Sequence, residues 1–443
     1  MSTDWPSVAL RDLCSIARGG SPRPIKNFIT DDPDGINWIK IGDTQKGGRY
    51  IDSTAEKIKP EGIARSRFVE EGSFLLSNSM SFGRPYILRT SGCIHDGWLV
   101  LEPDYARVDQ NFLYYVLGSR TVFDQFDRLA AGSTVRNLNI DLVKGVEIPL
   151  PPLEEQQRIV AVLDEVFEGL ARARAHAEAN LQNARELFES AVNSTVLGDR
   201  HRMPHDVQDD GVRDLKDEQR KRTNDRKFRG PRFIASKGEP KLPDGWIWAS
   251  PEQLCTHIVD CLHATPKWAT SGEVCLRTTN FRVGELDLTE TRYVSPETYA
   301  QRISRLEPKP GDVLYSREGG ILGIACIHPE GLKACLGQRM MQFRLRQNLM
   351  LPEFFCAVLN SALVLGEVRH FTGGAAAPHL NIGDIRQFPI PVPPLQEQAE
   401  MVEIIEAQTD GRRRLQSAYE TKIQYLDDLR QSLLQKAFAG ELT

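Results

Sequence analysis

The chain has 443 residues, 40% of them hydrophobic and 26% charged, with a formal net charge of −5. This is the balance of globular domains that bury a core, and the length predicts two to four of them. No apolar run approaches the roughly 20 residues of a membrane helix, and the N-terminus lacks the features of a signal peptide. We therefore expect a cytoplasmic protein whose eight cysteines are free thiols.

The sequence predicts a first mixed α+β domain over residues 1–148. Short runs such as 37–41 are typical of strands, and a helical stretch follows around 109–129. The loops between them combine small residues, arginines and hydrogen-bonding side chains, as in 19–24 and 77–84. Such loops are suited to recognition, although most polar loop residues only face water.

Segment 149–198 opens with a proline cluster and is predicted to be a long spacer helix. From Leu153 to Leu197 it would be about 68 Å long at ~1.5 Å per residue. Its 4-3 spacing of apolar residues is typical of a coiled coil. The predicted contact positions are Ile159, Leu163, Val166, Leu170, Ala173, Ala177, Asn180, Ala184, Leu187 and Ala191.

Residues 199–240 are interpreted as a flexible basic linker. The run 220–229 is basic and low in apolar residues, which favours a solvated tether between two larger parts. Contact of this run with nucleic-acid phosphates is a second, weaker interpretation.

A second α+β domain is predicted over 241–390, followed by a second spacer helix over 391–443. Its helical stretch lies around 352–369. The predicted contact positions of the second spacer helix are Met401, Ile405, Leu415, Tyr419, Leu426, Leu429 and Leu433, with polar Gln408, Arg412 and Lys422 between them.

The chain contains an internal sequence repeat. Leu138-Asn139-Ile140 recurs as Leu380-Asn381-Ile382, and 148–156 recurs as 390–398, both at an offset of 242 residues (380 − 138 and 390 − 148). Neither helix can bury its apolar stripe alone. We therefore expect an antiparallel pair with pseudo-twofold symmetry that presents two unlike heads.

No catalytic motif is found. The chain has no Gly-x-x-x-x-Gly-Lys-Ser/Thr phosphate loop, no nucleophile elbow and no His-Glu-x-x-His sequence. The cluster Cys255, His257, Cys261 and His263 matches no standard zinc spacing. We predict no catalytic, cofactor-binding or metal-binding residues in this chain.

The remaining polar loops predict DNA contacts, because arginine can bridge guanine, asparagine can bridge adenine, and hydroxyls can reach phosphates or base edges. For any one residue, an ordinary solvent-facing role is the competing interpretation. The candidates are Arg23, Lys26, Ser77, Asn78, Ser79, Arg84, Ser133, Thr134, Arg136, Asn137, Thr265, Lys267, Trp268, Arg277, Thr278, Asn280, Ser316, Arg317 and His379.

The order of these segments resembles the specificity subunit of type I restriction–modification enzymes over the whole chain. The motifs that carry the resemblance are 150–160 and 392–398, with support from Gly19-Gly20-Ser21-Pro22, 311–316 and 436–442. The resemblance implies a non-catalytic subunit with two target recognition domains, each reading one half of a bipartite DNA sequence. The helices would fix the unread spacer and, with other surfaces, dock the methylation subunits.

The partners implied are double-stranded DNA, methylation subunits in two copies, and restriction subunits. S-adenosylmethionine, ATP and Mg²⁺ are expected on those partner subunits, with no cofactor in this chain. Two alternatives stay open. One is a related type IIB-like or methylation-only system, and the other is a coiled-coil scaffold with no DNA role.

Overall fold

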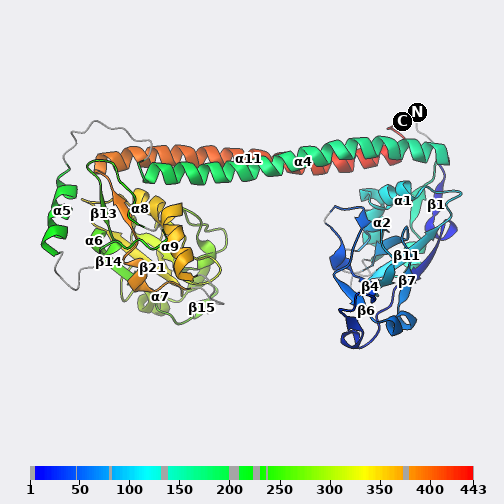
Figure 1. Ribbon diagram of the computed structural model, residues 1–443, viewed down its shortest axis with the longest axis horizontal. Coiled ribbons are helices and arrows are strands. Elements are labelled where there is room, and N and C mark those ends of the chain that lie inside the picture. The colour runs from blue at the N-terminus through cyan, green and yellow to red at the C-terminus, as the bar shows by residue number, and fades with distance from the viewer. Residues whose placement is uncertain are drawn as a thin grey trace. The chain divides into compact units, whose positions relative to one another are not determined.

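The computed structural model describes residues 5–45, 47–78, 82–130, 138–198, 209–222, 230–235, 238–372 and 379–442. They form two compact units, Met1–Ala179 with Tyr419–Thr443, and Asn180–Ala418. Each unit contains one mixed α+β head and one end of a pair of long helices (Figure 1). The α+β class predicted from the sequence is confirmed.

The described part of the first head contains two five-stranded sheets, ordered β2-β11-β8-β9-β5 and β3-β6-β4-β10-β7. Strands β1 and β12 pair separately and antiparallel. The strands are β1 (Ser7–Ala9), β2 (Cys14–Arg18), β3 (Ile29–Thr30), β4 (Ile36–Ile39), β5 (Tyr50–Ile51), β6 (Glu56–Ile58), β7 (Arg67–Val69), β8 (Phe74–Ser77), β9 (Pro85–Leu88), β10 (Gly92–Ile94), β11 (Trp98–Pro103) and β12 (Glu147–Pro149).

The α-helices in the described residues of this head are α1 (Gln110–Leu117), α2 (Arg120–Ala130) and α3 (Ile140–Lys144). Phe74 and Leu99 of the first sheet pack in one core with Phe112 of α1 and Phe126 of α2. Successive residues of β8 and β11 point to opposite faces of this sheet. Both faces are buried, because the opposite face packs in a second core that contains Trp98.

The part of the second head that the structure describes repeats this plan with two four-stranded sheets, β14-β21-β18-β19 and β15-β17-β16-β20. The strands are β13 (Ile247–Ala249), β14 (Cys255–Asp260), β15 (Trp268–Ala269), β16 (Glu273–Leu276), β17 (Arg292–Val294), β18 (Val313–Ser316), β19 (Ala325–Ile327), β20 (Ala334–Leu336), β21 (Met340–Leu345) and β22 (Ile390–Val392). The helices are α6 (Pro251–Leu254), α7 (Pro296–Arg302), α8 (Pro352–Leu359), α9 (Ala362–Thr372) and α10 (Ile382–Ile385). Strands β13 and β22 pair as β1 and β12 do.

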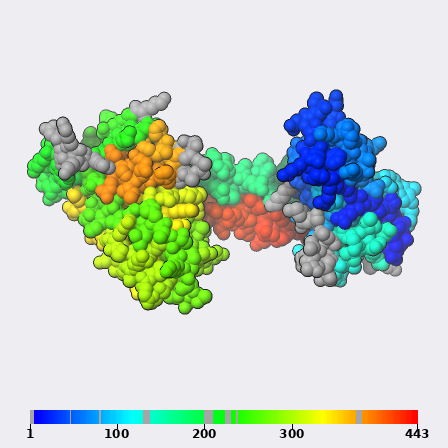
Figure 2. Space-filling view, turned by 90° about the horizontal axis from the view of Figure 1, so that it is seen from below, coloured from blue at the N-terminus to red at the C-terminus, as the bar shows by residue number. Residues whose placement is uncertain are grey.

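The long helices α4 (Leu153–Val196) and α11 (Leu395–Phe438) have 44 residues each. In the first unit Leu163, near the start of α4, shares a core with Leu434, near the end of α11. In the second unit Val196, at the end of α4, shares a core with Met401, near the start of α11. The helices are therefore antiparallel, as predicted, and Figures 1 and 2 show them side by side.

In the second part of α4 the predicted contact positions are wrong for Asn180 and Leu187, whereas Ala184 and Ala191 are half-buried. Asn180 and Leu187 point to solvent, Leu187 with 73% exposure, while Leu181 is half-buried and Phe188 packs against the second core. The spacing through Leu170, Ala173, Ala177 and Leu181 is 3-4-4, an 11-residue period that shifts the stripe by one position.

The same shift occurs in α11. Leu415 and Leu429 are 43% and 46% exposed, and Gln416, Ile423 and Arg430 are half-buried instead. Gln408 and Arg412 do lie in the contact stripe, where the Arg412 guanidinium lies 5.0 Å from the centre of the Phe188 ring. Polar groups therefore replace apolar packing in this part of the pair.

The prediction of a flexible linker over 199–240 is wrong for Asp210–Arg222, which forms helix α5. Val212 and Leu215, three residues apart on one face, are buried in the core of the second head. The polar composition of the segment concealed these two anchors. Residues 223–229 of the basic run lie outside the described residues.

All eight cysteines are buried and free. Among the described helices none alone is long and apolar enough to cross a membrane, and only α8 and α9 taken together, bent by 48°, reach that length and composition.

Candidate nucleic-acid interface

The repeated Pro-Pro-Leu-x-Glu-Gln motif fixes each long helix to its head through one buried glutamine. In the first unit Gln156 Oε1 accepts a hydrogen bond from the Asp109 N–H at 2.8 Å. Its Nε2 donates to the carbonyls of Arg107 and Pro151 at 2.9 and 2.8 Å. The side chain thus satisfies three backbone groups where α1 and α4 begin.

Gln398 does the same in the second unit. Its Oε1 accepts from the Leu351 N–H at 2.8 Å, and its Nε2 donates to the carbonyls of Leu349 and Pro393 at 2.9 and 2.8 Å. The three backbone partners are each 242 residues beyond those of Gln156. The repeat therefore extends upstream of the segment in which sequence similarity is visible.

The second repeated motif, Leu-Asn-Ile, binds in each head to the end of an inner strand of the first sheet. The Leu138 N–H donates to the Asn78 carbonyl at 3.0 Å, and the Leu380 N–H donates to the Arg317 carbonyl at 2.9 Å. Asn78 and Arg317 directly follow β8 and β18. The Leu-Asn-Ile segment thus has the same position relative to the sheet in both heads.

Strand directions gather the loops of each head at one edge. In the antiparallel sheets β2 and β8, or β14 and β18, end beside the starts of their neighbours. In the second sheets the parallel strands β4 and β10, or β16 and β20, end at the same place. We name the resulting surfaces the first loop edge (19–26, 40–43, 78, 82–84 and 95–97) and the second loop edge (261–267, 277–280, 317–323, 337–339 and 379).

A basic residue occupies one equivalent position on both edges. Lys40 precedes a 3-10 turn, Ile41–Asp43, and its backbone N–H donates to the Asp43 carboxylate at 2.7 Å. Arg277 precedes the turn Thr278–Asn280, and its N–H donates to the Asn280 side chain at 2.9 Å. The local fold is the same, while the cation differs.

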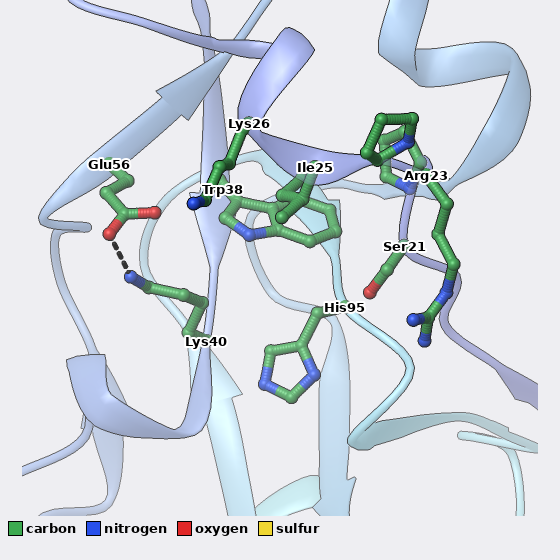
Figure 3. Close-up of a pocket in the computed structure, with 10 residues that line it drawn as sticks. Ser21, Arg23, Ile25, Lys26, Trp38, Lys40, Glu56 and His95 are labelled. Carbon is green, nitrogen blue, oxygen red and sulfur yellow. Dashed lines mark ion pairs between the residues drawn. The ribbon is translucent and has the colours of Figure 1, made fainter.

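The first loop edge is hollowed by a pocket of about 820 Å³. Figure 3 shows Lys40 and Glu56 on one side of it, joined by an ion pair of 2.5 Å, and Ser21 and Arg23 on the other. The full lining is Ser21, Pro22, Arg23, Pro24, Ile25, Lys26, Trp38, Lys40, Glu56 and His95.

Asp96 accepts hydrogen bonds from several residues of this edge. Its carboxylate accepts from the Ser21 hydroxyl at 2.8 Å and from Arg23 at 3.1 Å, and its carbonyl accepts from Arg18 at 3.0 Å. Burial by itself would raise the pKa of this carboxyl. The hydrogen bonds from Ser21 and the backbone, with the charges of His95 and Arg23, bring the pKa below its ordinary value.

The surroundings of His95 favour its neutral form. Burial lowers its pKa, and the nearby carboxylates of Asp96 and Asp43 oppose that shift without overcoming it. The backbone N–H groups of Ile41 and Gly97 lie 3.1 and 2.6 Å from the two ring nitrogens. A neutral ring can accept a hydrogen bond from one of these N–H groups, and a protonated ring can accept from neither.

The second loop edge has a different set of polar groups. Buried Arg317 donates to the Leu380 carbonyl at 3.1 Å and pairs with Glu318 at 2.9 Å. His263 lies 3.2 Å from the Asp260 carboxylate and 3.1 Å from the Arg317 guanidinium. A small pocket of about 10 Å³ adjoins this edge at Cys261, next to Asp260 and Arg302.

Comparison with known proteins places the chain. The family model of the type I restriction modification DNA specificity domain matches residues 2–179 and 289–424. The chain belongs to this family.

The type I restriction enzyme EcoBI specificity subunit of Escherichia coli is 20% identical over 99% of this chain and 86% of its own length. The EcoKI specificity subunit of Escherichia coli strain K12 is 22% identical over 78% of this chain and 68% of its own. These relatives match both units of the chain.

Two solved structures share the fold. A chain from a study of complex assembly and conformational transition of the type I R–M system has a TM-score of 0.71 at 19% identity, with all of both chains covered. The HsdS subunit from Thermoanaerobacter tengcongensis has a TM-score of 0.50 at 20% identity, covering 99% of this chain and 97% of that one. The arrangement of two heads and two helices is therefore that of specificity subunits.

The structure sorts the predicted DNA-contact residues into three groups. Arg23, Lys26, Arg84, Thr265, Lys267, Trp268 and His379 are exposed, and Arg277 and Thr278 are half-buried. Ser77, Asn78, Asn280, Ser316 and Arg317 are buried. Ser79, Ser133, Thr134, Arg136 and Asn137 lie outside the described residues.

The buried candidates support the loops. Asn280 donates to the carbonyls of Asp287 and Glu290 at 2.9 Å, and the Ser316 hydroxyl accepts from the Ile324 N–H at 3.0 Å. These groups are committed to backbone partners, which explains their polar character without a ligand. Their direct contact with DNA stays a prediction that the geometry does not favour.

Sequence reasoning missed several groups on these edges, namely Lys40, His95, Asp96, Gln338 and Arg339. The sequence held a signal for one of them. Lys40 stands three residues before Asp43, as Arg277 stands three before Asn280. In both heads a basic residue thus precedes, by three positions, the side chain that caps the following turn. The others come from short turns between strands, which carry no repeat.

Across the described ranges, no group of three or more His, Cys, Asp or Glu side chains is placed to hold a metal ion. Cys255 and Cys261 belong to two different hydrophobic cores, and the Cys261 sulfur accepts a hydrogen bond from the Met340 N–H at 3.2 Å. Burial raises the pKa of both thiols. The pair is built for packing.

Proposed function

We propose that this chain is the DNA-recognition subunit of a type I restriction–modification complex and that each head reads one half of a bipartite target. The observation that carries the proposal is the pairing of one frame with two unlike edges. Gln156 and Gln398 make the same three hydrogen bonds just after the ends of β11 and β21, whereas the loop edges, at the starts of these strands, present different side chains. Equivalent presentation of different readers suits a target with two different halves.

The charge of the chain supports recognition within a complex. A net charge of −5 gives little general attraction to DNA, so the loop edges would supply local contacts and the partner subunits the rest. We expect methylation subunits, in two copies, to close around the DNA, and restriction subunits to join them. S-adenosylmethionine, ATP and Mg²⁺ would be bound by those partners.

The long helices would set the number of unread base pairs between the two half-sites. Each helix is locked to its head at its first turn, so a change in helix length would reach the head without being absorbed by a flexible joint. A scaffold without a DNA role would need no loop edges of this kind.

The first experiment maps methylated bases genome-wide in cells that express this chain with its methylation subunits. Residues 1–148 are then exchanged for the first head of a relative. We expect one half of the methylated motif to change and the other half to persist. A motif that changes in both halves, or in neither, would contradict the proposal.

A second experiment removes seven residues from α4 and the seven that face them in α11. The expected result is a methylated motif with the same two halves and a shorter gap. An unchanged gap would remove the helices from the recognition of length. The same methylation maps, made with and without a restriction subunit, distinguish a complete type I system from a methylation-only one.

A further inference from the structure

One residue of the second loop edge has a backbone conformation that its side chain type disfavours. Arg339, directly before β21, has φ +74°, and it is the one non-glycine residue with positive φ among those the structure describes. Glycine would occupy this conformation without steric strain, whereas an arginine must place its Cβ against the backbone. The fold alone therefore gives no reason for an arginine here.

The strained residue is held firmly. Its carbonyl accepts from the Arg317 N–H at 3.0 Å. On one side Gln338 accepts from the Thr265 hydroxyl at 3.1 Å, and on the other the Met340 N–H donates to the Cys261 sulfur at 3.2 Å. The surrounding loops therefore fix where the side chain of residue 339 leaves the surface.

The arginine side chain lies at ordinary contact distance from a neighbouring glycine. A Cβ on Gly319 would lie 3.7 Å from Cδ and 3.4 Å from Nη1 of Arg339. Gly319 also has positive φ, at +92°. Two left-handed residues on adjacent loops thus bring the side chain of Arg339 alongside the loop that follows β18.

The guanidinium of Arg339 is uncommitted. It is exposed, and it makes no hydrogen bond or ion pair with any residue that the structure describes. Its neighbours on the same edge are engaged: Arg317 pairs with Glu318, and Arg277 donates to the Glu290 carbonyl at 2.8 Å. The free planar fork of Arg339 has the geometry that bridges O6 and N7 of guanine.

Resting on the proposed function, we infer that Arg339 is a specificity-determining residue of the second head and reads one guanine in the major groove of its half-site. The loop fixes the backbone of Arg339, and so the point from which its side chain leaves the surface, before binding, which reduces the conformational entropy lost by the backbone on contact. A contact to phosphate would use the charge alone and carry no base preference.

The test uses the full chain assembled with its methylation subunits and a set of duplexes in which each position of the methylated motif is replaced in turn. The variants are Arg339→Gly, which relieves the strained backbone, and Arg339→Lys, which keeps the charge but loses the fork. Lys267→Ala is the matched control, an exposed cation on the same loop edge.

For Arg339→Gly we expect affinity for the cognate duplex to fall about 10- to 100-fold. The preference at one G·C pair of the second half-site should be lost, the first half-site should be unaffected, and the Tm of the chain should stay equal or rise. Arg339→Lys should lose most of the same preference. Lys267→Ala should weaken binding evenly over all duplexes.

Three results overturn the assignment. They are unchanged preference in Arg339→Gly, an even loss over all duplexes with a salt dependence lower by about one ion, which marks a phosphate contact, or a lower Tm that shows a structural role. In each case the wild-type complex still prefers its motif, and the proposed function stands. If the wild-type complex shows no preference at all, both the proposed function and the role of Arg339 are wrong.

Discussion

The two heads share a frame and differ at the surface that the frame presents. Both place a two-stranded pair, a buried glutamine and a Leu-Asn-Ile segment at the same points. Yet one loop edge holds a pocket lined by His95 and a hydrogen-bond network on Asp96, and the other holds a network around buried Arg317 with the exposed guanidinium of Arg339. The comparison indicates that hydrogen bonds to backbone constrain the frame, whereas the edges are free to vary.

The largest test of this comparison removes the buried glutamine from each unit. Gln156→Ala leaves the half-buried Asp109 N–H and two carbonyls without their partner, so we expect a loss of about 2–4 kcal/mol in unfolding free energy. Gln398→Ala should lose a similar amount in the second unit. Chemical denaturation monitored by tryptophan fluorescence measures both.

Gln157→Ala is the matched control, because this neighbouring side chain is exposed and should change stability by less than about 0.5 kcal/mol. Losses that differ widely between Gln156→Ala and Gln398→Ala would mean that the two frames are not energetically equivalent.

A medium effect should separate the two ways in which a head contacts a long helix. In the first unit Arg49 hydrogen-bonds Asp164 of α4 and Tyr115 of α1, and its guanidinium lies 4.7 Å from the centre of the Tyr115 ring. In the second unit Arg413 of α11 pairs with Glu285 at 2.6 Å, with about half of each side chain exposed.

Arg49→Ala should therefore destabilise the first unit by about 2 kcal/mol, because it leaves partly buried polar groups without a partner. Arg413→Ala should change stability by less than about 1 kcal/mol, since the pair is exposed to solvent. Thermal denaturation of the full chain, with limited proteolysis to identify the unit that opens first, measures the difference. Equal effects would refute it.

The smallest effect concerns acid sensitivity. The folded pKa of His95 is below its unfolded value of about 6.5. The folded state thus favours the neutral ring, and stability is full above about pH 6.5 and is lost as pH falls toward the lower folded pKa. The Asp96 carboxyl, also with a lowered pKa, adds a loss only at more acidic pH.

His95→Gln cannot take up this proton and should lose about 1 kcal/mol at pH 7.5 through a weakened bond to Ile41. Its Tm should then depend less on pH between 7.5 and 5.5 than that of the wild type. A residual dependence is expected from His328 in the second head, whose pKa burial also lowers. An unchanged pH dependence would show that His95 does not titrate with folding.

The frame could be predicted from the sequence because its residues act over short distances. The proline cluster before Leu153 and the repeat of Leu138-Asn139-Ile140 both mark places where a few residues satisfy nearby backbone groups. Such requirements select the same residues in both copies. The start of each long helix and the antiparallel pairing followed from them.

The register of the helix pair could not be predicted, because it depends on the partner. Leu187 and Phe188 are both apolar, and the partners of Phe188, namely Arg412 on α11 and the core of the second head, are not visible in the sequence of α4. Helix α5 was missed for a related reason, since Val212 and Leu215 gain their partners from the second head. Arg339 left no sequence signal, because a single backbone angle distinguishes it from other loop arginines.

The glutamine locks have a consequence for direction as well as for length. Because Gln156 fixes the first turn of α4 to its head, each inserted residue would carry that head forward by ~1.5 Å and rotate it by about 100° about the helix axis. Insertions of 7 or 11 residues nearly restore the original heading, to within about 20°. Only a few insertion lengths therefore change the length of the helix while keeping the head close to its original orientation about the helix axis.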